Sequence, residues 1–241
     1  MNLVVDIGNT NTRWAVFRNK KMVEHNAING FSVESFKIIL SKYSMLKAIC
    51  VSNTASAVND IYEYCLKSNI KYIPIQDFSN LPLEIQYKTK NTLGSDRIAL
   101  AAGAVSKYSG VKLIIDLGTC ITYDIIVDNV YVGGQISLGL KMRLAALHSY
   151  THKLPSISFQ ESSAFLGTTT AEGMLVGVYD SFVFEIKNVI EKYKSRYPNA
   201  IVIITGGDMS LIKNKIKNIN FFDPYLLMEG LNYIIACNEE A

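Results

Sequence analysis

Apolar and polar residues alternate along the N-terminal segment of the chain, a period of two that is typical of β-strands. The alternation predicts strands at residues 2–6 and 12–18, separated by a Gly-Asn-Thr turn, and a third strand that begins at Lys21. Helical and extended patterns then follow in turn, with helices predicted at 32–43 and 56–67 and strands at 48–51 and 72–75. Elements in this order are typical of a parallel or mixed sheet covered by helices.

The same opening occurs a second time in the middle of the chain. The segment VVDIGNTNTRWAVF at residues 4–17 can be laid over IIDLGTCITYDIIV at residues 114–127. Three pairs of residues match in this alignment: Asp6 with Asp116, Gly8 with Gly118, and Thr12 with Thr122. The second copy is again followed by an extended segment, residues 131–137, and by a helical pattern from about Leu138.

The repeat predicts a duplicated domain, with an N-terminal half at residues 1–110 and a C-terminal half at residues 111–241. No linker rich in Pro, Ser or Gly marks the boundary, so its position rests on the repeat. The C-terminal half is also predicted to contain a long amphipathic helix that ends before Pro198, a buried strand at 200–204 and a last helix at 226–236. The apolar row of the long helix is predicted to be core: Met174, Val178, Phe182, Ile186, Ile190 and Tyr193.

Composition narrows the class of protein. The chain has 241 residues, 49% hydrophobic and 19% charged, which is ordinary for a globular protein. The formal net charge is only +3 and the basic residues are scattered, so the charge pattern does not indicate binding to nucleic acid. The four cysteines form no C-x-x-C pair, which indicates reduced thiols. No basic leader precedes the first strand and no apolar run approaches about eighteen residues, which predicts a soluble, cytoplasmic protein.

A strand that ends in Asp-x-Gly followed by hydroxyl residues is suited to binding phosphate, because glycine lets backbone N–H groups turn toward the anion. The carboxylates of Asp6 and Asp116 would be repelled by phosphate unless a cation lay between, so both predict bound metal ions. Asp-Gly pairs also make ordinary hairpin turns, the simplest interpretation of a single copy. Two matched copies facing each other across a cleft, with a third turn at Thr205-Gly206-Gly207, favour nucleotide binding.

These turns resemble those of the superfamily that contains acetate and sugar kinases, heat-shock chaperone ATPases and actin. Within it, the chain is similar to the type III pantothenate kinases over almost its whole length. The motifs that carry the resemblance are Asp6-Ile7-Gly8-Asn9-Thr10, Gly94-Ser95-Asp96-Arg97, Asp116-Leu117-Gly118-Thr119 with Thr122 and Asp124, Gly133-Gly134-x-Ile136, Thr151-x-x-Leu154-Pro155, and Thr205-Gly206-Gly207. The resemblance implies an α/β fold of two actin-like (ribonuclease H-like) domains, each with a mixed sheet, a β-meander start and flanking helices.

The resemblance also implies an activity. ATP would transfer its γ-phosphoryl group to the primary hydroxyl of pantothenate, forming 4'-phosphopantothenate in the first step of coenzyme A synthesis, and the protein would be a homodimer. Asp6 would hold Mg²⁺ through water, and Asp116 would bind the potassium or ammonium ion that the family requires. The ATP-binding residues carried over are Asp6, Ile7, Gly8, Asn9, Thr10, Asn11, Thr12 and Arg13 from the first turn, with Thr119 from the second.

For pantothenate, the resemblance makes Asp96 the catalytic base, and it makes the substrate-binding residues Tyr87, Gly94, Ser95, Asp96, Arg97 and Thr170. Each key position has an ordinary alternative. An Asp in the first turn of a helix is favoured by the helix dipole alone. Arg97 could pair with the substrate carboxylate or with a structural acid. Thr170 would be an ordinary first-turn residue if Thr169 and Glu172 form a capping box.

His148 and His152 have the spacing of a metal-binding pair, but no third ligand follows at a convincing distance, so a metal site is not predicted there. Three residues depart from the family pattern: Leu138 and Lys90 replace prolines and Cys120 replaces an alanine. None of them removes a group that does chemistry. Two other functions remain open, a different small-molecule kinase on the same fold and a catalytically silent regulatory binding module.

Overall fold

The computed structural model describes residues 1–241 except 9–10, 54–58, 76–79, 162–163 and 240–241. The chain forms two compact units. The first unit comprises residues 1–109, 126–133 and 225–241, and the second unit comprises residues 110–125 and 134–224. The C-terminal segment thus packs with the first unit. The boundary between duplicated halves at residue 110, which was inferred from the repeat, remains a prediction.

The first unit is built on a five-stranded sheet with the order β3-β2-β1-β4-β5. Its strands are β1 (Asn2–Ile7), β2 (Thr12–Arg18), β3 (Lys21–Ile28), β4 (Ala48–Asn53) and β5 (Lys71–Pro74). The central strand β1 runs antiparallel to β2 and parallel to β4. All six residues of β1 are buried, because helices cover both faces of the sheet at this strand.

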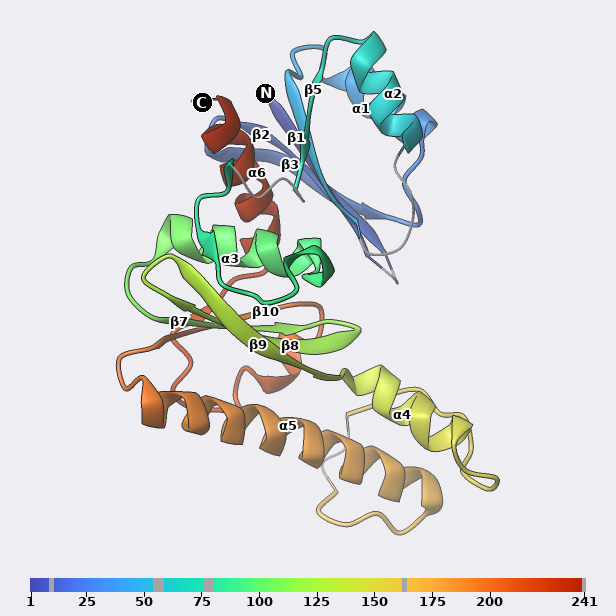
Figure 1. The fold of residues 1–241 in the computed structure, drawn as a ribbon. Helices are drawn as coiled ribbons and strands as arrows, with labels where there is room; N and C mark the ends of the chain where they lie inside the picture. The colour runs from blue at the N-terminus through green and yellow to red at the C-terminus, as the bar shows by residue number, and fades with distance from the viewer. Residues whose placement is uncertain (9–10, 54–58, 76–79, 162–163, 240–241) are drawn as a thin grey trace. The chain divides into compact units, whose positions relative to one another are not determined.

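Four helices belong to the first unit: α1 (Val33–Lys42), α2 (Asn59–Lys67), α3 (Ser95–Lys107) and α6 (Leu226–Glu239). Figure 1 shows α1 and α2 on one side of the first sheet and α6 on the other. On the α1–α2 side, alternate residues of β1 such as Leu3 and Val5 pack with Phe36 of α1 and Ile61 of α2. Helix α6 contacts β1 and β4 and lies along α3.

Helices α3 and α6 approach so closely that their backbones touch. A Cβ added at Gly230 of α6 would lie 1.9 Å from the carbonyl oxygen of Ala99 in α3. A Cβ added at Gly103 of α3 would lie 2.3 Å from the carbonyl oxygen of Leu226. Both glycines are therefore required by packing, since any side chain would force the two helices apart.

The other sheet has six strands in the order β11-β10-β7-β8-β9-β6. Their bounds are β6 (Glu84–Ile85), β7 (Lys112–Leu117), β8 (Cys120–Val127), β9 (Val130–Leu138), β10 (Ile201–Thr205) and β11 (Phe221–Phe222). Two longer helices lie in the second unit, α4 (Leu140–Ser149) and α5 (Thr170–Arg196). Within the described part of the chain, the 3₁₀ helices η2 (Lys90–Thr92) and η3 (Met209–Ile212) are also present.

Most elements predicted from the periodicity are confirmed within a few residues. Strands β7, β8 and β9 are neighbours in the second sheet, as β1, β2 and β3 are in the first, so the repeated opening of three strands is confirmed. The apolar row of α5 is buried from Met174 to Ile190, while Tyr193 is only half-buried. Among the described residues, no helix is both long and apolar enough to span a membrane.

One predicted helix start differs from the structure, another lies outside the described residues, and two short strands were not predicted. The helix predicted from Leu138 begins at Leu140, because β9 continues through Leu138 and Gly139 forms the turn between strand and helix. The helix predicted from residue 56 is α2, which begins at Asn59, and residues 56–58 lie outside the described part. The two-residue strands β6 and β11 were not predicted, since runs of two residues carry no periodicity.

We expect Gly230→Ala to lower the free energy of unfolding by about 1–3 kcal/mol or more, because the new methyl group would overlap the Ala99 carbonyl. Urea denaturation followed by far-UV circular dichroism measures the change. Gly177→Ala in α5 is the matched control, since nothing lies within 4 Å of its added Cβ. The control should be neutral or stabilise by up to about 1 kcal/mol. Equal stability of Gly230→Ala and wild type would contradict the packing constraint.

Candidate functional site

The first Asp-x-Gly turn joins β1 to β2 in the first unit. The Gly8 N–H donates a hydrogen bond to the Asn11 carbonyl oxygen at 3.2 Å, and a Cβ added at Gly8 would lie 3.2 Å from the same oxygen. Of the residues predicted to bind ATP, Ile7 and Thr12 are buried in the sheet, whereas Asn11 is exposed. Asn9 and Thr10 lie outside the described residues.

Asp6 is a buried carboxylate at the end of β1, only 4% exposed. Arg13, its neighbour across the β1–β2 ladder, donates a hydrogen bond from Nη2 to Oδ2 at 3.0 Å. Ser52 lies beside Asp6 in the parallel register with β4. Burial raises the pKa of Asp6, the arginine and the Ser52 hydroxyl lower it, and the charge of Asp96 raises it further.

These surroundings fit a bound divalent cation. Burial and the nearby carboxylate of Asp96 both oppose the negative charge on Asp6, and a cation would offset both effects. No cluster of three or more His, Cys, Asp or Glu side chains suited to a metal occurs among the described residues. A site with one protein carboxylate suits Mg²⁺, which commonly takes its other ligands from substrate phosphates and water.

Asp96 lies in the first turn of α3, with Gly94 as the N-cap residue. Its Oδ1 accepts a hydrogen bond from the backbone N–H of Arg97 at 2.8 Å, so the carboxylate folds back over the helix N-terminus. A Cβ added at Gly94 would lie 2.3 Å from that oxygen, so a side chain at position 94 would displace the Asp96 carboxylate from this position. The positive end of the helix dipole stabilises a carboxylate in this place.

A pair of serines connects the two acidic positions within the first unit. The Oγ atoms of Ser52 on β4 and Ser95 on α3 are 3.1 Å apart, and both residues are buried. Ser52 therefore contacts the Asp6 carboxylate on one side and the residue before Asp96 on the other. The sequence analysis missed Ser52. Its parallel register with Asp6 was the signal that could have identified it, once β4 was known to pair with β1.

Tyr87 and Arg97, both predicted to contact substrate, meet on Tyr131. The guanidinium carbon of Arg97 lies 5.9 Å from the Tyr131 ring centroid. The rings of Tyr87 and Tyr131 are 6.0 Å apart in an edge-to-face arrangement. Arg97 and Tyr131 are buried and Tyr87 is half-buried, so Tyr87 is the member of this group that reaches the surface. Tyr131 contacts both other residues, and it was not predicted to belong to this site.

The second Asp-x-Gly turn lies between β7 and β8 in the second unit. The Gly118 N–H donates to the Cys120 carbonyl oxygen at 3.1 Å. Asp116 is paired in register with Thr205 of β10. Gly206 follows with φ +96°, and a Cβ added there would lie 2.4 Å from Asp116 Oδ1. The third glycine turn of the sequence analysis thus packs directly on the predicted cation ligand, where only glycine fits.

A third segment, the start of α4, also meets this turn. The Gly139 N–H donates to the Thr119 carbonyl oxygen at 3.2 Å, and a Cβ added at Gly139 would lie 2.2 Å from it. Asp208 donates its N–H to the Leu117 carbonyl oxygen at 3.0 Å. Burial raises the pKa of the Asp208 carboxyl, and the charge of Lys141 lowers it. The N-terminus of α4 has no side-chain cap, so the geometry suits an anion near Thr119.

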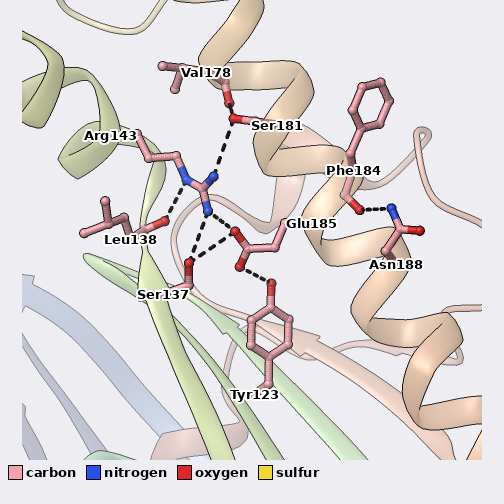
Figure 2. A network of polar contacts seen from close by, with 9 residues as sticks. All are labelled: Tyr123, Ser137, Leu138, Arg143, Val178, Ser181, Phe184, Glu185 and Asn188. Carbon is pink, nitrogen blue, oxygen red and sulfur yellow. Dashed lines mark hydrogen bonds and ion pairs between the residues drawn. The ribbon is translucent and has the colours of Figure 1, made fainter.

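Figure 2 shows the polar network that holds the β9–α4 junction. Arg143 donates from Nε to the Leu138 carbonyl oxygen at 2.9 Å and forms an ion pair with Glu185 of α5. Glu185 also accepts hydrogen bonds from the Tyr123 hydroxyl at 2.9 Å and the Ser137 hydroxyl at 3.2 Å. Burial, followed by the charge of Glu185, raises the pKa of Tyr123. Side chains rather than a proline restrain the junction where Leu138 departs from the family pattern.

The remaining predicted positions have mainly local roles in the structure. Thr169 and Glu172 form the predicted capping box, which is confirmed, and Thr170 is the exposed first residue of α5. The Thr122 hydroxyl donates to Asp124 Oδ2 at 3.2 Å, and both residues are buried. His148 Nδ1 lies 2.8 Å from the Leu154 carbonyl oxygen. A substrate contact by Thr170 remains a prediction.

Two sheets that each begin with three neighbouring strands, with glycine turns after β1, β7 and β10, define the actin-like, sugar-kinase class of fold. Solved structures support this fold class. A Baf family protein from Campylobacter jejuni superimposes with a TM-score of 0.65 at 22% identity, covering 99% of this chain and 100% of that one. An inorganic polyphosphate/ATP-glucomannokinase from Arthrobacter sp. strain KM does so with a TM-score of 0.51 at 14% identity, covering 99% and 98%. The predicted fold class is confirmed.

The sequence comparisons identify the family. A profile of the type III pantothenate kinases matches residues 2–192. The type III pantothenate kinase of Christiangramia forsetii is 38% identical, covering 99% of this chain and 99% of the relative. Those of Flavobacterium psychrophilum and Bacteroides fragilis are each 36% identical, covering 96% and 99% of this chain. The chain belongs to the type III pantothenate kinase family.

We expect Asp6→Asn to stabilise the ligand-free protein at about pH 7, by on the order of 1 kcal/mol. The folded-state pKa of Asp6 is raised, so its contribution to stability is full below the unfolded-state pKa and is lost as pH rises through the folded-state pKa. Asparagine has no charge to bury at any pH. The gain should therefore shrink as the pH falls toward the ordinary range of an aspartate.

Urea denaturation of both proteins without nucleotide or Mg²⁺, at neutral and acidic pH, measures this difference. Asp180→Asn replaces an exposed aspartate of α5 and serves as the matched control. A loss of stability on replacing Asp6 at neutral pH would mean that its pair with Arg13 outweighs the cost of burial.

We expect Glu185→Gln to destabilise the protein by about 1–3 kcal/mol. The amide cannot neutralise Arg143, and its single oxygen can accept a hydrogen bond from only one of the Tyr123 and Ser137 hydroxyls in their present positions. Thermal unfolding of the variant and of Glu191→Gln, an exposed position on the same helix, measures the effect. A change no larger than that of the control would show that the network does not restrain the junction.

Proposed function

We propose that this chain transfers the γ-phosphoryl group of ATP to the primary hydroxyl of pantothenate, which forms 4'-phosphopantothenate at the start of coenzyme A synthesis. Family membership supports the activity and both substrates, because the family profile spans most of the chain and relatives match it end to end. A kinase of this family uses ATP with a divalent metal. The observation that carries the assignment of roles is the Asp96 carboxylate at the N-terminus of α3, joined to Asp6 through Ser52 and Ser95.

Asp96 is the group that we assign to the pantothenate hydroxyl. The Arg97 N–H holds one oxygen of the carboxylate in a fixed orientation, and the other oxygen can accept a hydrogen bond from an alcohol. Phosphoryl transfer through a loose transition state needs little proton removal until late. Orientation of the hydroxyl is then the main contribution of Asp96, and uptake of its proton follows as the new bond forms.

We assign the nucleotide to the Asp6–Arg13 turn and to Thr119. Asp6 would hold Mg²⁺, whose bound charge offsets the negative charge of the phosphates. Backbone N–H groups in the first turn of α4, which has no side-chain cap, would supply further donors. We assign the monovalent cation, potassium or ammonium, to Asp116, because its carboxylate lies against Gly206 and needs an offsetting charge beside phosphate.

Substrate selection is assigned to the segment around Asp96. Gly94, Ser95 and Arg97 flank this carboxylate, and Tyr87 joins them through Tyr131. The cation–π contact with Tyr131 fixes the guanidinium of Arg97, which suits recognition of a carboxylate. Thr170 is proposed as a further substrate contact, supported by its exposed position at the start of α5.

A homodimer accounts for an exposed apolar surface on the second unit. Tyr150, Phe165 and Leu166 are 90%, 98% and 72% exposed, and they lie in and beside the connection between α4 and α5. A hollow of about 580 Å³ between the same helices is lined by Leu138, Met174 and neighbouring residues. Exposed apolar groups beside an apolar hollow are typical of a protein interface.

We also propose a cytoplasmic location, consistent with four free cysteines.

We expect Asp96→Asn to lower kcat by about 100-fold or more, because the amide cannot accept the proton, while the Kd for MgATP changes by less than about threefold. Coupled ADP release with MgATP and pantothenate measures turnover, in buffers with potassium or with sodium alone. Asp60→Asn, at an exposed position of α2, is the matched control. Wild-type turnover should require pantothenate and potassium or ammonium.

Three other outcomes would contradict the proposed activity or the proposed role of Asp96. ADP release that pantothenate does not stimulate would indicate another acceptor or simple ATP hydrolysis. Tight binding of both substrates without product would indicate a regulatory binding module. Full activity of Asp96→Asn would remove this carboxylate from the reaction.

A further inference from the structure

The first unit contains a cavity at the opposite end of β1 from Asp6. Its volume is about 560 Å³, within the range of small-molecule sites. It is lined by the start of β1, the β2–β3 turn, the end of α3 and one face of α6. The lining residues are Met1, Asn2, Phe17, Asn19, Lys20, Lys47, Ser106, Lys107, Glu229, Asn232, Tyr233, Ala236 and Glu239.

Hydrogen-bonded amides form part of the cavity lining. Asn2 donates from Nδ2 to Asn232 Oδ1 at 3.1 Å, and Asn232 donates from Nδ2 to the Asn19 carbonyl oxygen at 2.9 Å. Asn2 and Asn232 are only 7% and 6% exposed. Buried amides with fixed partners give a wall of defined shape and polarity. This part of the lining is therefore prearranged and does not depend on mobile side chains.

The charges and apolar groups of the lining favour an organic anion. Three lysines and two glutamates line the cavity, and Lys107 forms an ion pair with Glu229. Of the other charged side chains in the lining, Lys20 and Lys47 are positive and only Glu239 is negative, so their net charge is positive. Phe17, Ala236 and the ring of Tyr233 supply apolar surface for the rest of a ligand.

Two elements connect this cavity to the groups assigned to catalysis. Strand β1 begins in the lining with Asn2 and reaches Asp6 four residues later, about 13 Å along the strand. Helix α3 ends in the lining with Ser106 and Lys107 and carries Asp96 in its first turn, about 16 Å away along the helix. Helices α6 and α3 are in direct backbone contact at Gly230 and Gly103, so a displacement of α6 toward α3 would be passed on to α3.

We propose that this cavity is a second ligand site, for a small organic anion with an apolar group, and that its occupancy changes the use of substrates by the kinase through α3. A ligand between α6 and the end of α3 presses on a helix whose other end carries Asp96. Binding at the cavity requires no kinase activity. Only the kinetic consequence rests on the proposed function.

Two fluorescent probes with the same aromatic rings test the site. 8-Anilinonaphthalene-1-sulfonate carries an anionic sulfonate, and N-phenyl-1-naphthylamine lacks it. The anionic probe, called the sulfonate below, should bind the wild-type protein at one saturable site per chain. MgATP together with pantothenate should not displace it. In Lys20→Gln/Lys47→Gln, its Kd should rise about tenfold, while binding of the neutral probe should change little.

Matched variants separate the site from general effects. Lys67→Gln/Lys187→Gln removes two exposed lysines outside the lining and should leave the sulfonate affinity unchanged. Ala236→Trp fills the cavity from α6 and should abolish specific binding in a protein whose thermal unfolding remains cooperative. Saturating sulfonate should shift the KM for pantothenate by about threefold or more in wild type and not in the Lys20/Lys47 variant.

The proposal is overturned if the two lysine pairs have equal effects, if the substrates displace the sulfonate, or if KM is the same with and without bound probe. A wild-type protein without pantothenate-dependent activity would count against the proposed function alone, because the two binding titrations would still report on the cavity.

Discussion

The site of this protein depends on a negative charge placed where burial opposes it. Asp6 lies near the end of the central strand of the first sheet, nearly inaccessible to water, and its pKa is raised despite the pair with Arg13. A raised pKa means that burial disfavours the charged form of this carboxylate in the protein alone. In the complex that we propose, a bound cation would offset this cost, so the same burial that opposes the charge would favour binding of Mg²⁺.

Features carried by local pattern were predictable from the sequence. The alternation in β1 and β2, the apolar row of α5 and the Thr169 capping box all depend on neighbours along the chain, and each is confirmed. The motifs around Asp6, Asp96 and Asp116 were sufficient to identify the family. Their chemical roles were inferred by resemblance and remain proposals.

Features that arise between distant segments were not predictable in this way. Ser52 became part of the site only because β4 pairs with β1 in one particular register. From its sequence neighbours, Gly139 is an ordinary residue before a helix. In the structure its N–H donates to the carbonyl oxygen of Thr119, twenty residues earlier in the chain. The helix at 226–236 was predicted as part of the C-terminal half, whereas α6 packs against the first sheet, and an amphipathic pattern alone does not specify which sheet a helix covers.

That last placement has a consequence for how the protein is made. Helix α6 covers one face of a sheet whose five strands precede the second unit in the chain, whereas the residues of α6 follow that unit. During synthesis, the face of β1 and β4 that α6 covers stays open until α6 itself has been made, and the second unit can fold before then. The nascent chain therefore exposes an apolar sheet face while the whole second unit is being made.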